Sequence, residues 1–316
     1  MSTISRKTSF KELIHRQLNS LSCFGQSKYQ AKQQSYQQGN KGKVQGIYSK
    51  QTMKIYKTVG NEFSSWSKSK GYTFRALSEV KDTHIIEYLS ERQTAEKSAW
   101  TISRDLSALN KIFSRSISKK QAGLKCRKNT DIQNNRGFGN NYRNSIYKKN
   151  QALTNFISAT GIRRQSVSTI CPLNAIRNND GTVIGFHITE KGGKSRNAIV
   201  LKSKQAEITN FVNERISQNG NAPFWNEPSK NLNTHWYRGQ YAKSLYEELL
   251  IAKNNNQDYY VGNRSTFINE SKFEQAIQGH KETTKGYDTE CLALVSQSLG
   301  HNRIDVVYSN YLSRFN

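Results

Sequence analysis

The chain has 316 residues, 34% of them hydrophobic, and carries 48 Lys and Arg residues against 23 Asp and Glu residues. This length favours two domains, and no apolar run approaches the ~20 residues that a bilayer crossing needs. The net charge of +25 predicts a polyanionic partner. Nucleic acid fits better than an anionic membrane, because no basic amphipathic segment with a Trp or Leu face is evident.

The first residues and the cysteines indicate a cytoplasmic protein. The N-terminal stretch lacks the apolar core of a secretory signal. Cys23, Cys126, Cys171 and Cys291 form no CxxC pair, so neither a zinc site nor disulfides are predicted.

Residues 1–50 are basic and rich in glutamine, with Glu12 as the one acidic residue among them. The stretch QSKYQAKQQSYQQGNKGK contains few apolar residues. We expect a flexible basic arm that either becomes helical on a partner or stays a solvated tail.

Residues 51–118 have the periodicity of a small helical unit. Tyr56, Val59, Phe63 and Trp66 lie on one helical face, with Thr52 as the predicted cap and Gly71 just past the end. Further helices are predicted over 82–92 and 99–117. Residues 119–150 then form a basic linker that leads into the next domain.

Residues 151–316 are predicted to form a second, mostly helical domain with a small antiparallel sheet. The helices are expected at 150–160, 206–217 and 242–252, and the strands at 182–189 and 196–201, joined by a turn with Gly192 and Gly193. The whole chain is thus predicted to be mainly α with a small antiparallel β-sheet.

Four short pieces of the second domain carry groups suited to chemistry on a phosphate. They are ATGIRRQSVSTI, EKGGKSR, THWYRGQYAKSLY and LGHNRIDVVYSNYL. Each piece alone is a common chance pattern, so the information lies in their order along one helical domain.

This order resembles the tyrosine recombinases, the phage-integrase class, over about residues 52–316. The TGxR box matches Thr160, Gly161 and Arg163, and the hairpin lysine matches Lys191. The remaining matches are the HxxR box, at His235 and Arg238, and the LGH box, at Leu299, Gly300 and His301. The resemblance implies a two-domain C-shaped DNA clamp, with a SAM-like core-binding domain at 51–118 and a catalytic domain at 151–316.

The implied activity is cleavage and rejoining of DNA strands through a 3′-phosphotyrosine, with no metal or other cofactor. Arg163 and Arg238 would hold the non-bridging oxygens with paired N–H donors, and His235 and His301 would donate or accept protons. Tyr311 would be the nucleophile, and Lys191 would protonate the departing 5′-oxygen.

Several assignments have alternatives. Tyr308 is the other candidate nucleophile, and Lys194 is the other candidate acid. Ser166 stands where relatives often have an acid, and His280 is interpreted as a surface residue of an insert. Further DNA contacts are predicted for basic residues in both domains: Arg104, Lys111, Lys119, Lys120, Arg164, Lys194 and Arg196.

The resemblance also implies partners and a setting. The partners are double-stranded DNA with specific recombination sites, further copies of this chain in a tetramer on DNA, and an accessory DNA-bending or excision factor. The setting is the nucleoid of a bacterial-type cell, with integration or excision of a mobile element as the role. The alternatives are a type IB topoisomerase-like enzyme and a catalytically decayed DNA-binding protein. A strand-exchange assay separates the topoisomerase from a recombinase. A nicked substrate traps a covalent adduct only if the protein is catalytically active, so it separates the decayed protein from both.

Overall fold

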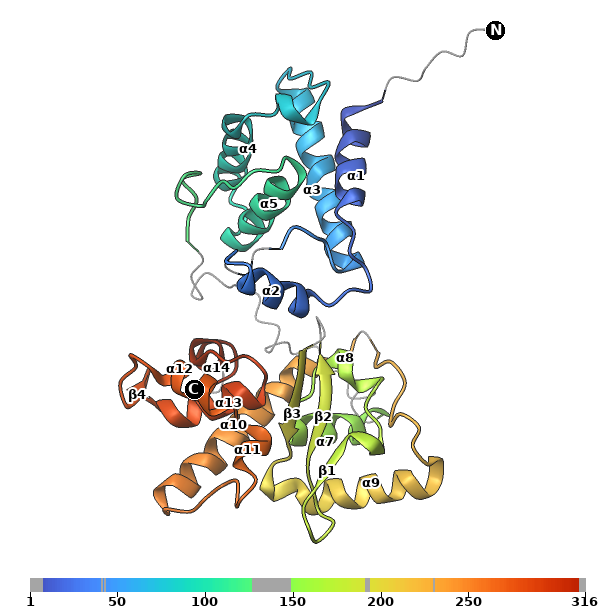
Figure 1. Cartoon of the computed structure of the whole chain (residues 1–316), viewed down its shortest axis with the longest axis vertical. Coiled ribbons are helices and arrows are strands. Elements are labelled where there is room, and N and C mark those ends of the chain that lie inside the picture. The colour runs from blue at the N-terminus through green and yellow to red at the C-terminus, as the bar shows by residue number, and fades with distance from the viewer. Residues whose placement is uncertain are drawn as a thin grey trace. The chain divides into compact units, whose positions relative to one another are not determined.

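The computed structural model describes residues 8–40, 42, 44–126, 149–190, 194–229 and 231–312. Over these residues the chain is mainly α-helical, with one three-stranded and one two-stranded antiparallel sheet (Figure 1). The predicted fold class is therefore confirmed. The chain divides into two compact units, residues 1–133 and 134–316. The C-shaped arrangement of these units around DNA stays a prediction.

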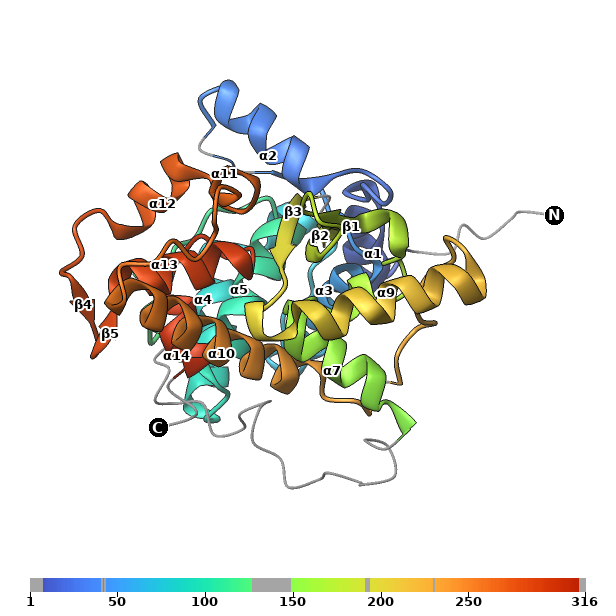
Figure 2. The same ribbon diagram turned by 90° about the horizontal axis from the view of Figure 1, so that it is seen from below.

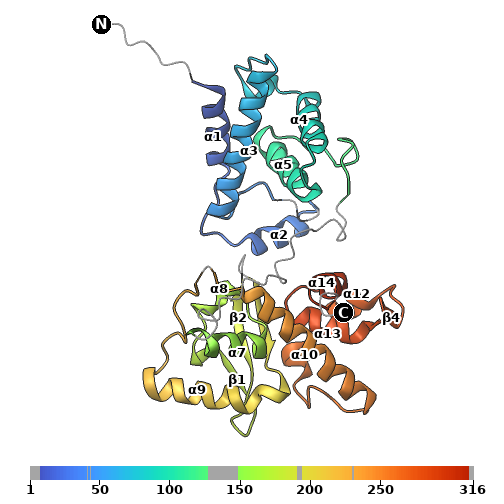
Figure 3. The ribbon, with the colours of Figure 1, turned by 180° about the vertical axis from the view of Figure 1, so that it is seen from behind.

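Unit 1 is a helical bundle. Its helices are α1 (Phe10–Ser20), α2 (Lys28–Gln37), α3 (Lys50–Ser69), α4 (Asp82–Thr94) and α5 (Ala99–Ile112), with the short 3-10 helix η1 (Leu77–Glu79). Figure 3 shows α1 alongside α3, with α4 and α5 on the opposite side of α3. The side chain that caps α3 is Ser49, whose Oγ accepts from the Thr52 N–H at 3.1 Å, rather than the predicted Thr52.

The first helix differs from the expected flexible arm. Ile14 and Leu18 on one face of α1 are fully buried and join the core of unit 1. The following segment is tied to that core as well, since Lys111 Nζ donates to the carbonyls of Val44 and Gln45. The reason is amphipathicity within residues 10–20, which the polar composition of the arm as a whole obscured.

The core of unit 1 also continues beyond residue 118, where the linker was expected to begin. Ala122 and Leu124 are buried against the helices, so the described part of the linker up to residue 126 belongs to this unit. Most of the rest of the predicted linker, residues 127–148, lies outside the described residues.

Unit 2 is built around a three-stranded sheet and a long helix. The strands are β1 (Ala175–Arg177), β2 (Val183–Glu190) and β3 (Lys194–Ile199), in the order β1-β2-β3. Strands β2 and β3 lie close to the predicted ranges, whereas β1 was not predicted. The helices that accompany the sheet are α7 (Gln151–Thr160), α8 (Arg164–Val167), α9 (Gln205–Asn219) and α10 (Thr234–Asn254), with 3-10 helices η3 (Pro172–Asn174) and η4 (Lys202–Lys204).

The segment between the HxxR and LGH boxes is ordered into short elements. They are α11 (Arg264–Phe267), α12 (Glu270–Ile277), β4 (Thr283–Thr284) and β5 (Tyr287–Asp288), followed by α13 (Thr289–Ser298) and α14 (Ile304–Asn310). Figure 2 shows α12 and the β4–β5 hairpin gathered beside α13, against which both pack. His280 is exposed in this segment, as expected for a surface residue.

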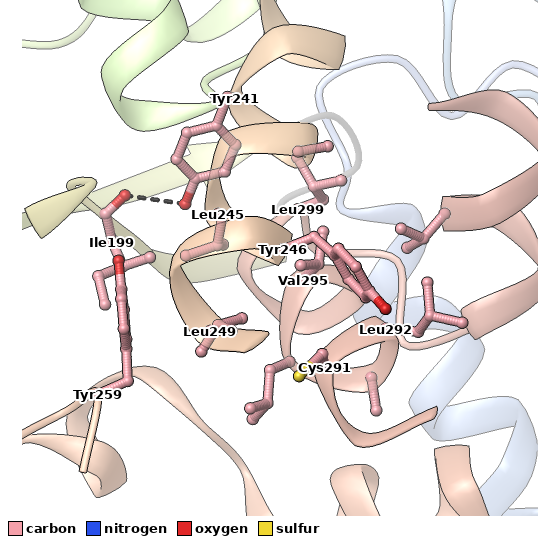
Figure 4. Packing of buried hydrophobic residues seen from close by; sticks show 14 of the residues in the cluster. Ile199, Tyr241, Leu245, Tyr246, Leu249, Tyr259, Cys291, Leu292, Val295 and Leu299 are labelled. Carbon is pink, nitrogen blue, oxygen red and sulfur yellow. Dashed lines mark hydrogen bonds between the residues drawn. The ribbon is translucent and has the colours of Figure 1, made fainter. Parts of the chain in front are cut away.

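Helices α10 and α13 share one hydrophobic core behind the candidate site. Figure 4 shows Leu245 and Leu249 of α10 packed near Val295 of α13 and Leu299. The buried Tyr241 of α10 donates its hydroxyl to the Ile199 carbonyl of β3 at 2.9 Å. This packing fixes helix α10 relative to β3 and to the end of α13. Within the described residues, no helix combines the length and the apolar character needed to cross a bilayer.

Candidate active site

The TGxR box ends helix α7 and turns the chain toward Arg163. Gly161 adopts a left-handed conformation with φ 61°, and its N–H donates to the Ile157 carbonyl at 2.8 Å. This is the αL motif that closes many helices. A Cβ at Gly161 would overlap the ring of Tyr241, so the close approach of α7 to α10 also requires glycine. Arg163 then stands immediately before α8.

The LGH box is the C-terminal cap of α13. Gly300 has φ 73°, its N–H donates to the Gln297 carbonyl at 2.7 Å, and the His301 N–H donates to the Ser296 carbonyl at 2.8 Å. These two bonds define a Schellman motif, which favours glycine at the left-handed position. The box therefore has a local structural function, because it ends helix α13.

Three arginines converge on the ends of these two helices. Arg238 donates through Nη1 to the Gly161 carbonyl and through Nη2 to the Leu299 carbonyl. Arg163 Nη2 donates to the same Leu299 carbonyl at 3.2 Å, and Arg196 Nη1 donates to the Ser298 carbonyl. Carbonyls at a helix C-terminus lack intrahelical partners and carry partial negative charge. The C-termini of α7 and α13 thus hold the guanidiniums in place.

A buried carboxylate also lies among these arginines. Glu190, the last residue of β2, pairs with Arg163 Nη1 through Oε2 and with Arg196 Nη2 through Oε1, the latter at 3.0 Å. Relatives often have a carboxylate residue three positions after the first arginine, where this chain has Ser166. Here the carboxylate that contacts Arg163 is Glu190 of β2. Sequence reasoning missed Glu190. The sequence did contain a sign that Glu190 is buried, because side chains alternate along a strand and residues 186, 188 and 190 share its buried face.

Burial and mutual repulsion act on the arginine cluster. Burial, and next the Arg238 and Arg196 charges, lower the pKa of Arg163 to about 9. Burial, and next Arg238, lower the pKa of Arg196 to about 9. Both values stay above neutral pH, and the Glu190 carboxylate opposes the repulsion, so we expect the Arg163 and Arg196 guanidiniums to be charged at neutral pH. Three cations and one anion leave an excess of positive charge that attracts an anion.

Tyr311 lies at the C-terminal end of α14, against this cluster. Its hydroxyl accepts from Arg238 Nε at 3.3 Å and lies 3.1 Å from His301 Nε2. The His235 ring stacks on the Tyr311 ring with centroids 5.3 Å apart and planes 3° apart. The structure therefore brings together five of the six residues predicted as catalytic: Arg163, His235, Arg238, His301 and Tyr311.

Tyr308, the alternative nucleophile, has a different environment. Its ring packs against the hydrophobic core formed by α10, α13 and α14. The predicted acid, Lys191, lies outside the described residues, as does the side chain of its alternative, Lys194. Their roles stay predictions.

Two arginines predicted as DNA contacts have mainly structural partners in unit 2. Arg164 donates through Nη1 to the carbonyls of Pro228 and Ser229 and through Nη2 to that of Leu232, so it holds the loop before α10. Only 7% of the Arg196 side chain is exposed, which places it inside the arginine cluster rather than on an outer DNA-facing surface. The DNA contact predicted for Arg196 stays a prediction; its described partners are Glu190 and the Ser298 carbonyl.

The basic residues predicted as DNA contacts in unit 1 differ in accessibility. Arg104 is exposed and donates through Nε and Nη2 to Oδ1 of the fully buried Asp105. Lys120 is exposed and Lys119 is half-buried. The Lys111 ammonium instead donates to backbone carbonyls. Burial and the charge of Lys28 lower the pKa of Lys111. A DNA contact is thus less favoured for Lys111 than for Arg104.

One family model matches part of the chain. Residues 43–120 match the N-terminal SAM-like domain of phage integrase. This range contains α3, α4 and α5 and corresponds to the core-binding domain predicted from the sequence. Among proteins of curated function, none matches the chain.

Three solved structures are similar to the chain at low identity. XerH recombinase with palindromic difH substrate, in a post-cleavage complex, has a TM-score of 0.46 and 16% identity, and the match covers 86% of this chain and 96% of XerH. XerH with difH in a pre-cleavage complex has a TM-score of 0.44, 18% identity and coverages of 88% and 98%. XerA recombinase has a TM-score of 0.28, 11% identity and coverages of 95% and 93%.

The match that bears on the family lies in unit 1. Residues 43–120 are similar to the N-terminal SAM-like domain of phage integrases, and this confirms the predicted resemblance to the tyrosine recombinase family.

Proposed function

We propose that the chain is a site-specific DNA recombinase that cleaves and rejoins DNA strands through a 3′-phosphotyrosine at Tyr311. One observation carries the proposal. The Tyr311 hydroxyl lies within hydrogen-bonding distance of both Arg238 Nε and His301 Nε2. A phenol held between a guanidinium and an imidazole, beside two more arginines, is suited to attack a phosphodiester.

In the proposed cleavage step, the Tyr311 oxygen attacks the scissile phosphorus and its proton passes to His301. A P–O bond to tyrosine forms as the P–O5′ bond breaks. The departing 5′-oxygen takes a proton from Lys191, or from Lys194 in the alternative assignment. Religation is the reverse reaction, in which a 5′-hydroxyl of another strand attacks and tyrosine leaves. The covalent link conserves the bond energy, so the step requires no ATP.

The arginines would stabilise the pentacoordinate transition state. Negative charge on the non-bridging oxygens increases as the tyrosine oxygen approaches, and Arg163 and Arg238 can each offer N–H donors to those oxygens. Because the carbonyls at the ends of α7 and α13 already orient both guanidiniums, little reorganisation would be needed during the reaction. His235, stacked on the Tyr311 ring, would hold the nucleophile in position.

The proposed partner is duplex DNA with specific recombination sites. The net charge of +25 and the SAM-like domain at 43–120 support DNA binding. Pairwise strand exchange would require a tetramer on two duplexes, and an accessory bending or excision factor would set the direction. Integration and excision of a mobile element is the proposed role.

The direct test uses a duplex nicked close to the cleavage site, from which the short 5′-hydroxyl fragment diffuses away and leaves the covalent adduct trapped. Proteolysis and mass spectrometry of the adduct should identify the peptide that contains Tyr311. A second assay with two differently labelled duplexes should yield recombinant strands. Adduct without strand exchange would support a topoisomerase-like enzyme instead, and no adduct on any bound site would support a DNA-binding protein without catalysis.

A further inference from the structure

Glu190 occupies a buried position, where removing a carboxylate from water costs free energy. It continues the buried face of β2 after Phe186 and Ile188, and only 3% of its side chain is exposed. A buried carboxylate is tolerated only where its oxygens are paired. Here both oxygens are paired, since Oε1 accepts from Arg196 Nε at 3.1 Å and Nη2 at 3.0 Å, while Oε2 pairs with Arg163.

The surroundings leave this carboxylate little freedom to move. A Cβ added to Gly300 would lie 2.9 Å from Arg196 Cδ and 3.2 Å from Glu190 Oε2. The LGH turn is therefore packed directly against the ion pairs. Any shift of Glu190 would displace Arg196, whose other donor holds the Ser298 carbonyl at the end of α13.

Arg163 connects this buried carboxylate to the accessible part of the site. Its Nη1 pairs with Glu190 and its Nη2 donates to Leu299, which fixes the plane of the guanidinium. Yet 29% of the Arg163 side chain remains exposed, so part of it can meet a ligand. Glu190 itself is too deeply buried to do so. Because its oxygens already accept from two guanidiniums, it is suited to orient arginines rather than to transfer protons.

We propose that Glu190 is a positioning residue for the strand-cleavage reaction: it orients Arg163 toward the scissile phosphate and relieves repulsion within the arginine cluster. The proposal rests on the function proposed above. It also assigns Arg196 a part in the site, as the partner that keeps Glu190 in place.

The test compares Glu190→Gln with the wild-type chain in single-turnover cleavage of a nicked duplex. Glutamine has the same shape but no charge, and we expect the cleavage rate to fall about 10- to 100-fold, as is typical when a residue that orients a metal ligand is lost. The DNA dissociation constant should change little. Glu207→Gln is the matched control, because Glu207 is exposed and pairs with Lys204 on the surface. A wild-type cleavage rate in Glu190→Gln would overturn the proposal.

Two further measurements separate positioning from general damage to the fold. In a double-mutant cycle, Glu190→Gln should add little to the loss caused by Arg163→Ala, whereas independent effects would multiply. On a duplex with a neutral methylphosphonate at the scissile position, the penalty of Glu190→Gln should shrink, since the arginine then has no anionic oxygen to hold. Multiplying effects, or an undiminished penalty on the neutral substrate, would contradict the proposal.

Glu190→Asp provides a second test in case Glu190→Gln does not fold. Aspartate keeps the charge, so the fold should persist, while its shorter reach should leave cleavage between the wild-type and glutamine rates. Equal rates for Glu190→Asp and the wild type would show that the position of the carboxylate is unimportant. If the wild-type chain itself forms no adduct with DNA that it binds, the proposed function fails. If it forms the adduct and Glu190→Gln does so equally fast, only the positioning proposal fails.

Discussion

Nε2 of His301 lies 3.1 Å from the hydroxyl of Tyr311, ten residues further along the chain. The two residues flank α14: His301 is the last residue of the Schellman motif that ends α13, and Tyr311 follows α14 as its C-cap. Arg303 reinforces the turn between them, because its backbone N–H donates to Ser296 Oγ at 2.7 Å and its carbonyl accepts from the same hydroxyl. The distance between imidazole and phenol is thus set by one compact cap-and-helix unit.

Replacement of Tyr311 by phenylalanine should abolish the covalent DNA adduct while DNA binding persists. The change removes only the hydroxyl that contacts Arg238 and His301. Denaturing electrophoresis of the trapped adduct, next to a mobility-shift assay, measures both properties. Tyr308→Phe is the matched control and should retain the adduct, because the Tyr308 ring packs against the core. An adduct that persists in Tyr311→Phe but disappears in Tyr308→Phe would reverse the assignment.

Gly300→Ala should destabilise the fold and impair cleavage together. The left-handed backbone strains any residue with a Cβ by roughly 1–2 kcal/mol. The new methyl group would also press on Arg196 and Glu190. Gly279→Ala is a matched control with a similar φ of 75° but no atom within 4 Å of the added Cβ. Urea denaturation should show a larger loss of stability for Gly300→Ala, and only this variant should lose cleavage; equal behaviour of the two would argue against tight packing at the LGH turn.

Asp288 should make the stability of α13 sensitive to acid. Partial burial alone would raise the pKa of Asp288, but its bond from the Cys291 N–H and its pairing with Lys253 outweigh burial and lower that pKa. A carboxyl whose pKa is lower in the folded state stabilises the fold above its unfolded pKa, and this contribution disappears as the pH falls through the folded value.

Asp288→Asn should therefore lower the melting temperature at pH 7 and have a diminishing effect as the pH falls below about 4. Thermal melts of the variant and the wild type across this range measure the difference. Asp258→Asn in the same unit provides a comparison from a loop that does not cap α13. A constant difference between Asp288→Asn and the wild type at all pH values would contradict the linkage.

Helix α2 should contribute to DNA affinity. No acidic residue occurs between Glu12 and Glu62, and α2 exposes Lys28, Lys32 and the aromatic side chain of Tyr36. Lysine contacts with phosphates release bound cations, so the double change Lys28→Gln and Lys32→Gln should weaken binding and reduce the slope of log affinity against log salt by roughly 1–2. Lys204→Gln, a lysine paired with Glu207 on unit 2, is the control. An unchanged slope would exclude α2 from the DNA interface.

Much of the fold could be predicted from local patterns. The apolar spacing through α3, α4, α5 and α7 predicted those helices, because one buried face repeats every three or four residues along the chain. The TGxR and LGH boxes were identified through the resemblance to tyrosine recombinases, and the structure shows that each is a helix cap with a glycine in the left-handed conformation. The amphipathic α1 was missed because its short apolar face lies within a segment of polar composition.

The sequence by itself determined the helical character of the chain, its positive charge and the order of the candidate catalytic boxes, since composition and periodicity are properties of neighbouring residues. Only the tertiary structure decided which cations share a site. Arg163 and the Leu299 carbonyl are 136 residues apart, and no local pattern reports their contact. No local pattern reports the contacts of Glu190 with Arg163 and Arg196, or the contact of Arg164 with the loop before α10. A guanidinium has several donors, and the tertiary fold determines which acceptors they meet.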